Sequence, residues 1–305
     1  MLGTEGLGVS ISRVERRILD KPDGFYDPLA RGPEIQNTTI PALIFVPAIF
    51  REKLCRHDYQ LPMKIRIAQL AVSRGIESNF SRILNVLKGA QPEDWVVFPE
   101  AVLSGYAPHE SDYSEKLDWS QISQYLTKIR QAAVDAGCRT LVGSAVLVEG
   151  GWRNSVQIFG KDGDHFQYHK RELSRLDQRH FIPGEKPEKH HVDGIEIGVL
   201  ACRELLFPGH WSSLRAQGTK VIFHLNNALH PKDAIWKHLL IARAIENAAF
   251  VVSVNNADHP QALPSFVIAP DGTILQETHL QTNEVLTQEV DLDSVVDDLS
   301  QRTDF

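Results

Sequence analysis

Apolar and polar residues follow two patterns from Met63 onward. The run MKIRIAQLAV alternates like a half-buried strand, in which successive side chains point to opposite faces. Apolar residues between Trp119 and Ala133 recur at helical spacing, and Gly137 supplies a stop for this long helix. Further strands are expected at DWVVFPE, TLVGSAVLV, NSVQIFG, HFQYHK, IEIGVLA, TKVIFHL, FVVSVNN and VLTQEVDL.

Capping and turn residues divide these elements. Asn79 is suited to cap one helix, and Asp233 to cap a later helix that runs through Ala249. The Asp162-Gly163 pair predicts a hairpin with a primed turn, and SFVIAPDGTILQE predicts a second hairpin. Strands and helices that alternate along the chain, mixed with hairpins, predict an α/β body with mixed sheets.

The first 62 residues differ from the rest of the chain. They are rich in turn formers, and their apolar run ALIFVPAIF follows Pro41 and contains Pro47. Proline cannot donate to a sheet ladder, so this run suits an edge strand or a docked loop better than a helix. Two interpretations stay open: an extension that packs on the body, or an upstream start with Met63 opening the functional core. We divide the chain into an N-terminal extension, 1–62, and one domain, 63–305.

Composition narrows the function classes. The 305 residues are 42% hydrophobic, which is enough for a full-sized core. A net charge of -7 argues against nucleic acid as the main partner. No apolar run is long enough for a bilayer and no secretory signal is visible, so we expect no membrane association. Three cysteines form an odd set without close pairing, which fits a reducing, cytoplasmic location.

Three reactive side chains stand at the ends of predicted strands. Glu100 ends the run WVVFP, Lys170 ends HFQYH, and Cys202 ends IEIGVLA. Reactive groups of α/β proteins gather at the carboxyl ends of strands, so these three are expected to meet. Each also has an ordinary interpretation, because a lone cysteine is often a small buried hydrophobe and the other two are often surface charges.

Carboxylate, ammonium and thiol together fit acyl transfer. Glu100 could take the proton of Cys202, which would turn the thiol into a strong nucleophile. Lys170 and the backbone N–H of Arg203 could stabilise the oxyanion of a tetrahedral intermediate. That N–H is available if Cys202 sits at a sharp turn after its strand, like the nucleophile elbow of serine hydrolases.

Three segments resemble the signature segments of the nitrilase superfamily, the carbon–nitrogen hydrolases. They are FPEAVLSGY at 98–106, YHKREL at 168–173 and VLACRELLFP at 199–208, in the family's order and at its approximate spacing. The resemblance covers Met63 to about Asp291. It implies a four-layer α-β-β-α sandwich of the nitrilase type and hydrolysis of a C–N bond without a cofactor.

The resemblance also assigns roles and an assembly. Glu100 matches the general base, Lys170 the oxyanion-stabilising lysine and Cys202 the nucleophile that forms a thioester. A homodimer or larger homo-oligomer is implied, with the helix 233–249 near the interface. A small amide or N-carbamoyl compound is the implied substrate.

Several positions depart from the family's usual pattern. Asp177 stands where many members carry a second glutamate, and aspartate is one methylene shorter, so its reach toward the lysine is in doubt. We treat it as a candidate auxiliary acid, against the alternative of an ordinary loop aspartate. Arg203 directly after the cysteine is unusual. The remaining candidate substrate contacts in these segments are Tyr106, Arg203, Glu204 and Asn226.

The remaining histidines and arginines near these segments have ordinary structural interpretations. His165, His169 and His180 lie near Lys170 in sequence, but no pair has ligand spacing with a partnering acid, so no metal is expected. Arg175, Arg179 and Arg203 could bind a substrate carboxylate, while the first two are equally explained as solvated.

Four functions remain in competition. The first is cysteine-dependent hydrolysis of a small amide or N-carbamoyl compound, which releases ammonia or an amine. The second is an acyl or amide-forming transferase that uses the same residues with an amine in place of water. The third is a catalytically weak binding or scaffold protein. The fourth is a redox sensor at Cys202, for which the sequence offers no obvious resolving partner and leaves Cys138 open.

Overall fold

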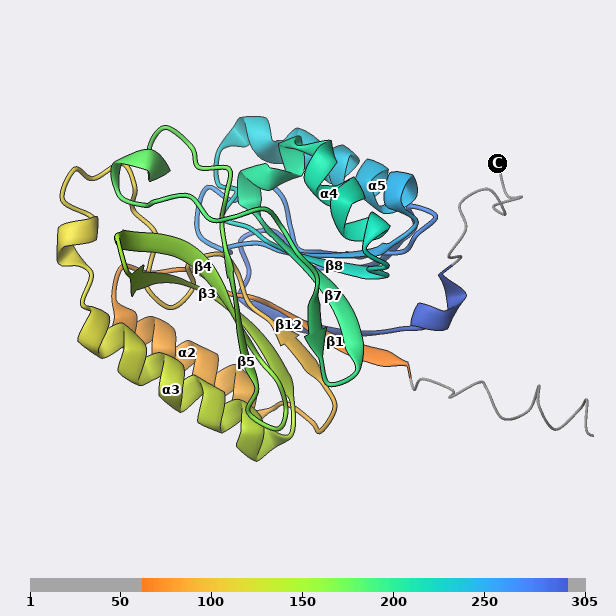
Figure 1. The fold of residues 1–305 in the computed structure, drawn as a ribbon, viewed down its shortest axis with the longest axis horizontal. Coiled ribbons are helices and arrows are strands. Elements are labelled where there is room, and N and C mark those ends of the chain that lie inside the picture. The colour runs from red at the N-terminus through yellow and green to blue at the C-terminus, as the bar shows by residue number, and fades with distance from the viewer. Residues whose placement is uncertain (1–61, 296–305) are drawn as a thin grey trace, which may run out of the picture. The chain divides into compact units, whose positions relative to one another are not determined.

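Two six-stranded sheets pack face to face in the computed structural model, which describes residues 62–295 (Figure 1). Residues 1–61 of the predicted extension, with ALIFVPAIF, lie outside the described part. None of the helices formed by residues 62–295 has the length and apolar character needed to cross a bilayer.

The helices and strands follow in chain order. The α-helices are α2 (Ile76–Lys88), α3 (Trp119–Ala136), α4 (Pro208–Ala216) and α5 (Trp236–Asn247). The 3-10 helices are η1 (Ser114–Lys116), η2 (Asp177–Arg179), η3 (Cys202–Leu206), η4 (Pro231–Ile235) and η5 (Leu292–Ser294). The strands are β1 (Met63–Gln69), β2 (Trp95–Val97), β3 (Arg139–Val148), β4 (Gly151–Phe159), β5 (His165–His169), β6 (His190–Val192), β7 (Ile195–Ala201), β8 (Val221–Leu225), β9 (Phe250–Val254), β10 (Phe266–Ile268), β11 (Ile274–Glu277) and β12 (Glu284–Val290).

The two sheets repeat one pairing pattern. The first has the order β12-β1-β2-β3-β4-β5 and the second β6-β7-β8-β9-β10-β11. Read in these orders, both sheets show one antiparallel pair, two parallel pairs and two antiparallel pairs. The α2 and α3 helices lie outside the first sheet, and α4 and α5 outside the second (Figure 1). The expected four-layer α-β-β-α sandwich is confirmed.

The core between the sheets forms because the central strands are apolar on both faces. All five residues of β8 and of β9 are buried, as parallel strands covered on both sides require. The rings of Trp95 on β2 and Phe223 on β8 stack across the interface with centroids 5.6 Å apart. A second cluster, which includes Ile83 and Ile129, joins the first sheet to α2 and α3.

Two predicted helix caps, at Asn79 and Asp233, were wrong. The α2 helix begins at Ile76, and Asn79 lies inside it, buried and bonded to the backbone of Ser73 and to that of Leu103. The α5 helix begins at Trp236, because the residues around Asp233 form the separate turn η4. Each polar side chain has a capping residue's chemistry but finds a different partner in the fold.

The hairpin between β4 and β5 is present, but its turn is not primed. Only Gly163 has a positive φ, of 91°, whereas a type I′ turn requires the same of Asp162. Gly163 donates to the carbonyl of Gly160, whose N–H donates to Asp164. These bonds fit the three-residue hairpin loop in which a left-handed glycine follows a type I turn.

A close backbone approach fixes the loop after β2. A Cβ atom on Gly143 of β3 would lie 2.3 Å from the amide nitrogen of Ala101 and 2.7 Å from the Cα of Glu100. The carbonyl of Gly143 also accepts from the N–H of Leu103. Glycine therefore lets the loop that carries Glu100 lie directly on the strand.

We expect Gly143→Ala to lower the free energy of unfolding by about 1–3 kcal/mol, because the added methyl must push the loop away. Urea unfolding followed by circular dichroism measures the change. Gly209→Ala on α4 is the matched control, since a Cβ there meets nothing within 4 Å. Equal stability of the two variants would contradict the close approach.

Candidate active site

The three predicted reactive groups come together at the carboxyl ends of their strands. Lys170 follows β5 directly, Cys202 follows β7 directly, and Glu100 lies three residues after β2. The Lys170 Nζ is 2.7 Å from Glu100 Oε1, and both side chains are 1% exposed. The charges of Glu100 and Lys170 both act on the thiol of Cys202. Both sheets therefore supply parts of one buried cluster.

Glu100 has one oxygen filled and one oxygen free. Its Oε1 accepts from Lys170 Nζ and, at 2.8 Å, from Asn154 Nδ2. Its Oε2 is buried without a hydrogen-bond partner in the described part of the chain. A buried carboxylate oxygen without a donor is costly, which marks Oε2 as the atom available to accept a proton. The carboxylate is close enough to the Cys202 thiol to perturb it by hydrogen bonding.

Cys202 sits on a strained turn after β7. Its φ of 49° is a left-handed conformation that residues with a side chain rarely adopt. The residue keeps part of its surface exposed. Burial of the sulfur, followed by the charge of Glu100, raises the pKa of the thiol well above its usual value and outweighs the opposing effect of Lys170. The thiol is therefore protonated at rest, and it could act as a nucleophile only if a base removed its proton.

Lys170 is a permanent cation at this site. Burial on its own lowers the pKa of the ammonium, but the surrounding negative groups, Glu100 first among them, raise that pKa well above its usual value. The ammonium contacts two carboxylates, since Asp177 Oδ2 lies 3.1 Å from Nζ. Its position next to the nucleophile suits it to stabilise negative charge on a substrate oxygen.

Asp177 reaches the lysine despite its shorter side chain. Its side chain is fully buried, and its Oδ1 accepts from the hydroxyl of Tyr106 at 2.5 Å. Burial raises the pKa of this carboxyl, but the charge of Lys170 and the hydrogen bonds together lower it by more, so the pKa lies below its usual value. Burial also raises the pKa of the Tyr106 hydroxyl, which keeps it a donor. Asp177 is thus a buried ionised partner of Lys170.

Glu204 clamps the segments that carry two of the reactive groups. Its Oε2 accepts from the N–H of Ala201, the residue before the nucleophile, at 2.7 Å. Its Oε1 accepts from the N–H of Arg171, the residue after the lysine, at 2.8 Å. The hydroxyl of Tyr168 donates to the same carboxylate. Both oxygens are filled by protein donors, which leaves Glu204 no oxygen for the substrate contact expected from sequence.

The other candidate substrate contacts have protein partners. The guanidinium of Arg203 donates to the carbonyl of Leu173 at 2.6 Å and lies over the ring of Phe207. The amide nitrogen of Asn226 donates to Ser253 Oγ at 2.6 Å, and its Oδ1 is buried without a partner in the described chain. The side chains of Arg175 and Arg179 are exposed.

Two residues of the cluster were missed in the sequence. Asn154 was expected only as the first residue of the strand NSVQIFG, although it donates directly to Glu100. His224 bonds the carbonyl of Cys202 at 2.8 Å from within β8. The signal for His224 was present, since one polar residue interrupts the otherwise apolar strand VIFHL.

The histidines act as hydrogen-bonding residues. His165 bonds Gln157, His169 bonds Ser155, and His180 bonds Ser114. No group of three or more potential ligand side chains within residues 62–295 is arranged to hold a metal ion.

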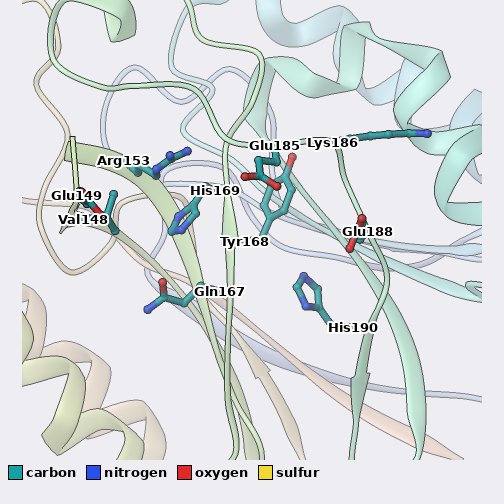
Figure 2. A pocket seen from close by; sticks show the side chains of 10 residues that line it. All are labelled: Val148, Glu149, Arg153, Gln167, Tyr168, His169, Glu185, Lys186, Glu188 and His190. Carbon is teal, nitrogen blue, oxygen red and sulfur yellow. The ribbon is translucent and has the colours of Figure 1, made fainter. Parts of the chain in front are cut away.

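A hollow of about 440 Å³ is lined by residues that include Tyr168 and His169, directly before Lys170. Figure 2 shows that β5 and the segment leading into β6 line it, including Glu185, Lys186 and Glu188. Its lining mixes both charge signs and contains none of the three reactive residues. The candidate site is the buried cluster, in which Cys202 is the partly exposed residue.

Known proteins match the chain in sequence. The sequence profile of the family described as carbon-nitrogen hydrolase matches residues 64–298. An (R)-stereoselective amidase of Pseudomonas sp is 30% identical over 197 residues, which cover 63% of this chain and 70% of the amidase. A 2-oxoglutaramate amidase of Bacillus subtilis (strain 168) is 30% identical over 213 residues, which cover 67% of this chain and 81% of that relative.

Solved structures match the fold. A member of branch 10 of the nitrilase superfamily from Saccharomyces cerevisiae has a TM-score of 0.69 at 21% identity and covers 78% of this chain and 93% of its own. A CN-hydrolase superfamily protein from Xanthomonas campestris has a TM-score of 0.66 at 23% identity, with 76% and 91% covered.

We expect Glu204→Gln to lower the free energy of unfolding by about 2–4 kcal/mol, because either orientation of the amide places an N–H against a buried backbone N–H. Urea unfolding measures the loss. Glu115→Gln is the control, since the Glu115 side chain is exposed on η1. A Glu204→Gln protein as stable as this control would contradict the clamp.

The raised thiol pKa predicts the pH dependence of Cys202 reactivity. We expect its rate of thiolation by methyl methanethiosulfonate to keep rising beyond about pH 9 without a plateau. Glu100→Gln should shift the rise to lower pH, because it removes a negative charge that raises this pKa. Mass spectrometry of the Cys202 peptide follows the rate. A plateau at neutral pH in the unaltered protein would contradict a protonated resting thiol.

Proposed function

The chain belongs to the carbon–nitrogen hydrolase family, and we propose that it hydrolyses a small amide or N-carbamoyl compound through a thioester on Cys202. The amidase relatives support an enzyme that acts on amides. The observation that carries the mechanism is the arrangement of Glu100, whose Oε1 binds Lys170 while Oε2 has no partner among the described residues, and whose charge acts on the Cys202 thiol.

Acylation begins with a proton transfer. Glu100 Oε2 takes the thiol proton as the sulfur attacks the substrate carbonyl carbon, and the carbonyl electrons move onto its oxygen. Lys170 Nζ and the N–H of Arg203 receive this oxyanion. One such donor typically contributes about 3–4 kcal/mol to transition-state stabilisation. When the tetrahedral intermediate collapses, the C–N bond breaks and Glu100 returns the proton to the departing nitrogen, which leaves as ammonia or an amine.

Deacylation uses the same groups with water. Glu100 takes a proton from a water molecule while the water oxygen attacks the thioester carbon. Lys170 Nζ and the N–H of Arg203 hold the second oxyanion. Collapse breaks the C–S bond, the proton returns to sulfur, and the acid product leaves. Throughout, Asp177 Oδ2 accepts from the Lys170 ammonium, and Asp177 Oδ1 accepts from the hydroxyl of Tyr106.

Burial supports a small substrate and a reducing compartment. Glu100, Lys170 and Asp177 are almost inaccessible and Cys202 is only partly exposed, so the reacting group of a substrate must be small enough to reach this cluster. One guanidinium nitrogen of Arg203 already donates to the carbonyl of Leu173, which restrains this side chain. We also propose a cytoplasmic location, because a thiol nucleophile must stay reduced.

We expect Cys202→Ala to reduce ammonia release from a panel of small amides, carbamoyl amines and nitriles by roughly 10⁴-fold or more, because no other group can form the thioester. Intact-mass analysis of the unaltered protein during turnover should show an acyl adduct on Cys202. Cys138→Ala is the control, since Cys138 is buried away from the site and contacts Thr140.

A Cys202→Ala protein that kept the normal rate would overturn the proposal. Added hydroxylamine or alkyl amine distinguishes the transferase alternative, in which amide products would exceed the free acid.

A further inference from the structure

A buried polar network contacts the backbone carbonyl of Cys202. His224 is fully buried in β8, and its Nε2 is 2.8 Å from the backbone carbonyl oxygen of Cys202. Its Nδ1 lies 3.1 Å from Asn226 Nδ2, which donates to Ser253 Oγ at 2.6 Å. A histidine in an apolar strand, with partners on both ring nitrogens, is held in one orientation.

The partners determine the tautomer of this histidine. A carbonyl oxygen can only accept, so Nε2 carries the hydrogen that it donates to Cys202. Nδ1 is then unprotonated and accepts from the amide of Asn226. Burial lowers the pKa of His224 to about 4, against the opposing effect of its bond to Cys202, so the ring is neutral at neutral pH.

The bonded carbonyl belongs to the peptide that carries the oxyanion donor. The Cys202 carbonyl and the Arg203 N–H lie in one planar trans peptide and point in opposite directions. A bond that fixes the carbonyl therefore also fixes the direction of the N–H. The left-handed φ of Cys202 makes this restraint necessary, because such a conformation is unfavourable for a residue with a side chain and persists only when its surroundings hold it.

We propose that His224 is a positioning residue that aims the Arg203 N–H at the substrate oxyanion by holding the opposite end of the same peptide. This inference rests on the proposed function, because it assigns His224 a part only in steps that form an oxyanion. Attack of the sulfur on a reagent without a carbonyl does not use the Arg203 N–H and should not depend on His224.

Two variants separate the donor from the volume of the ring. His224→Leu keeps apolar bulk and removes the N–H, while His224→Gln keeps an N–H at the end of a side chain of similar reach. Four quantities are measured for each variant and the unaltered protein. They are kcat and KM for ammonia release, the affinity for butyraldehyde, which forms a thiohemiacetal on Cys202, and the rate of thiolation by methyl methanethiosulfonate.

We expect His224→Leu to lower kcat roughly 10- to 100-fold with little change in KM, and to weaken butyraldehyde binding by a similar factor. Thiolation should stay within about twofold, because that reaction forms no oxyanion. His224→Gln should recover most of kcat and aldehyde affinity. A fall in thiolation that matches the fall in kcat would overturn the inference in favour of a general packing role, and so would an unchanged kcat.

A measurement on the unaltered protein covers the case in which His224→Leu does not fold. Nitrogen-15 shifts of the His224 ring should report the tautomer protonated at Nε2, and protonation at Nδ1 alone would overturn the inference. An unaltered protein that releases ammonia while His224→Leu keeps its rate overturns this inference alone. An unaltered protein that shows neither ammonia release nor an adduct on Cys202 overturns the proposed function as well.

Discussion

The ammonium of Lys170 is the group on which the architecture of the site depends. A buried cation is costly unless negative partners surround it, and here Glu100 and Asp177 contact it from different segments. The loop after β2, the end of β5 and the turn η2 must therefore converge, and each brings a functional side chain with it. Charge neutralisation in the interior and assembly of the site are one event.

Two buried glutamates of the site do opposite work because they have different numbers of donors. Both oxygens of Glu204 are filled by backbone N–H groups and a tyrosine hydroxyl, so its carboxylate joins two segments and has no capacity for chemistry. Glu100 has donors on one oxygen only. The same residue type becomes a clamp in one place and a base in the other, through the local count of hydrogen bonds.

Sequence reasoning located the candidate reactive residues because each stands at or just after the end of a predicted strand. Glu100, Lys170 and Cys202 were found in this way, and the resemblance ordered their roles. The structural roles of Glu204 and His224 could not be predicted, because their partners lie far away in sequence. Glu204 binds Tyr168 and Arg171, and His224 binds the Cys202 carbonyl, all at least 22 residues away. The cap predicted at Asn79 failed for the same reason, because a tertiary contact with Leu103 competes with the local bond.

The repeated pairing pattern of the two sheets divides the molecule into halves that are alike in architecture and unequal in chemistry. The half that ends with β5 contributes the acid–base group and the cation, and the half that starts with β6 contributes the sulfur and the elbow amide. Neither half on its own holds a complete reaction centre. The proposed reaction would therefore take place where two comparable sheets meet, and the last strand of the described chain, β12, ties the second half back to the first sheet.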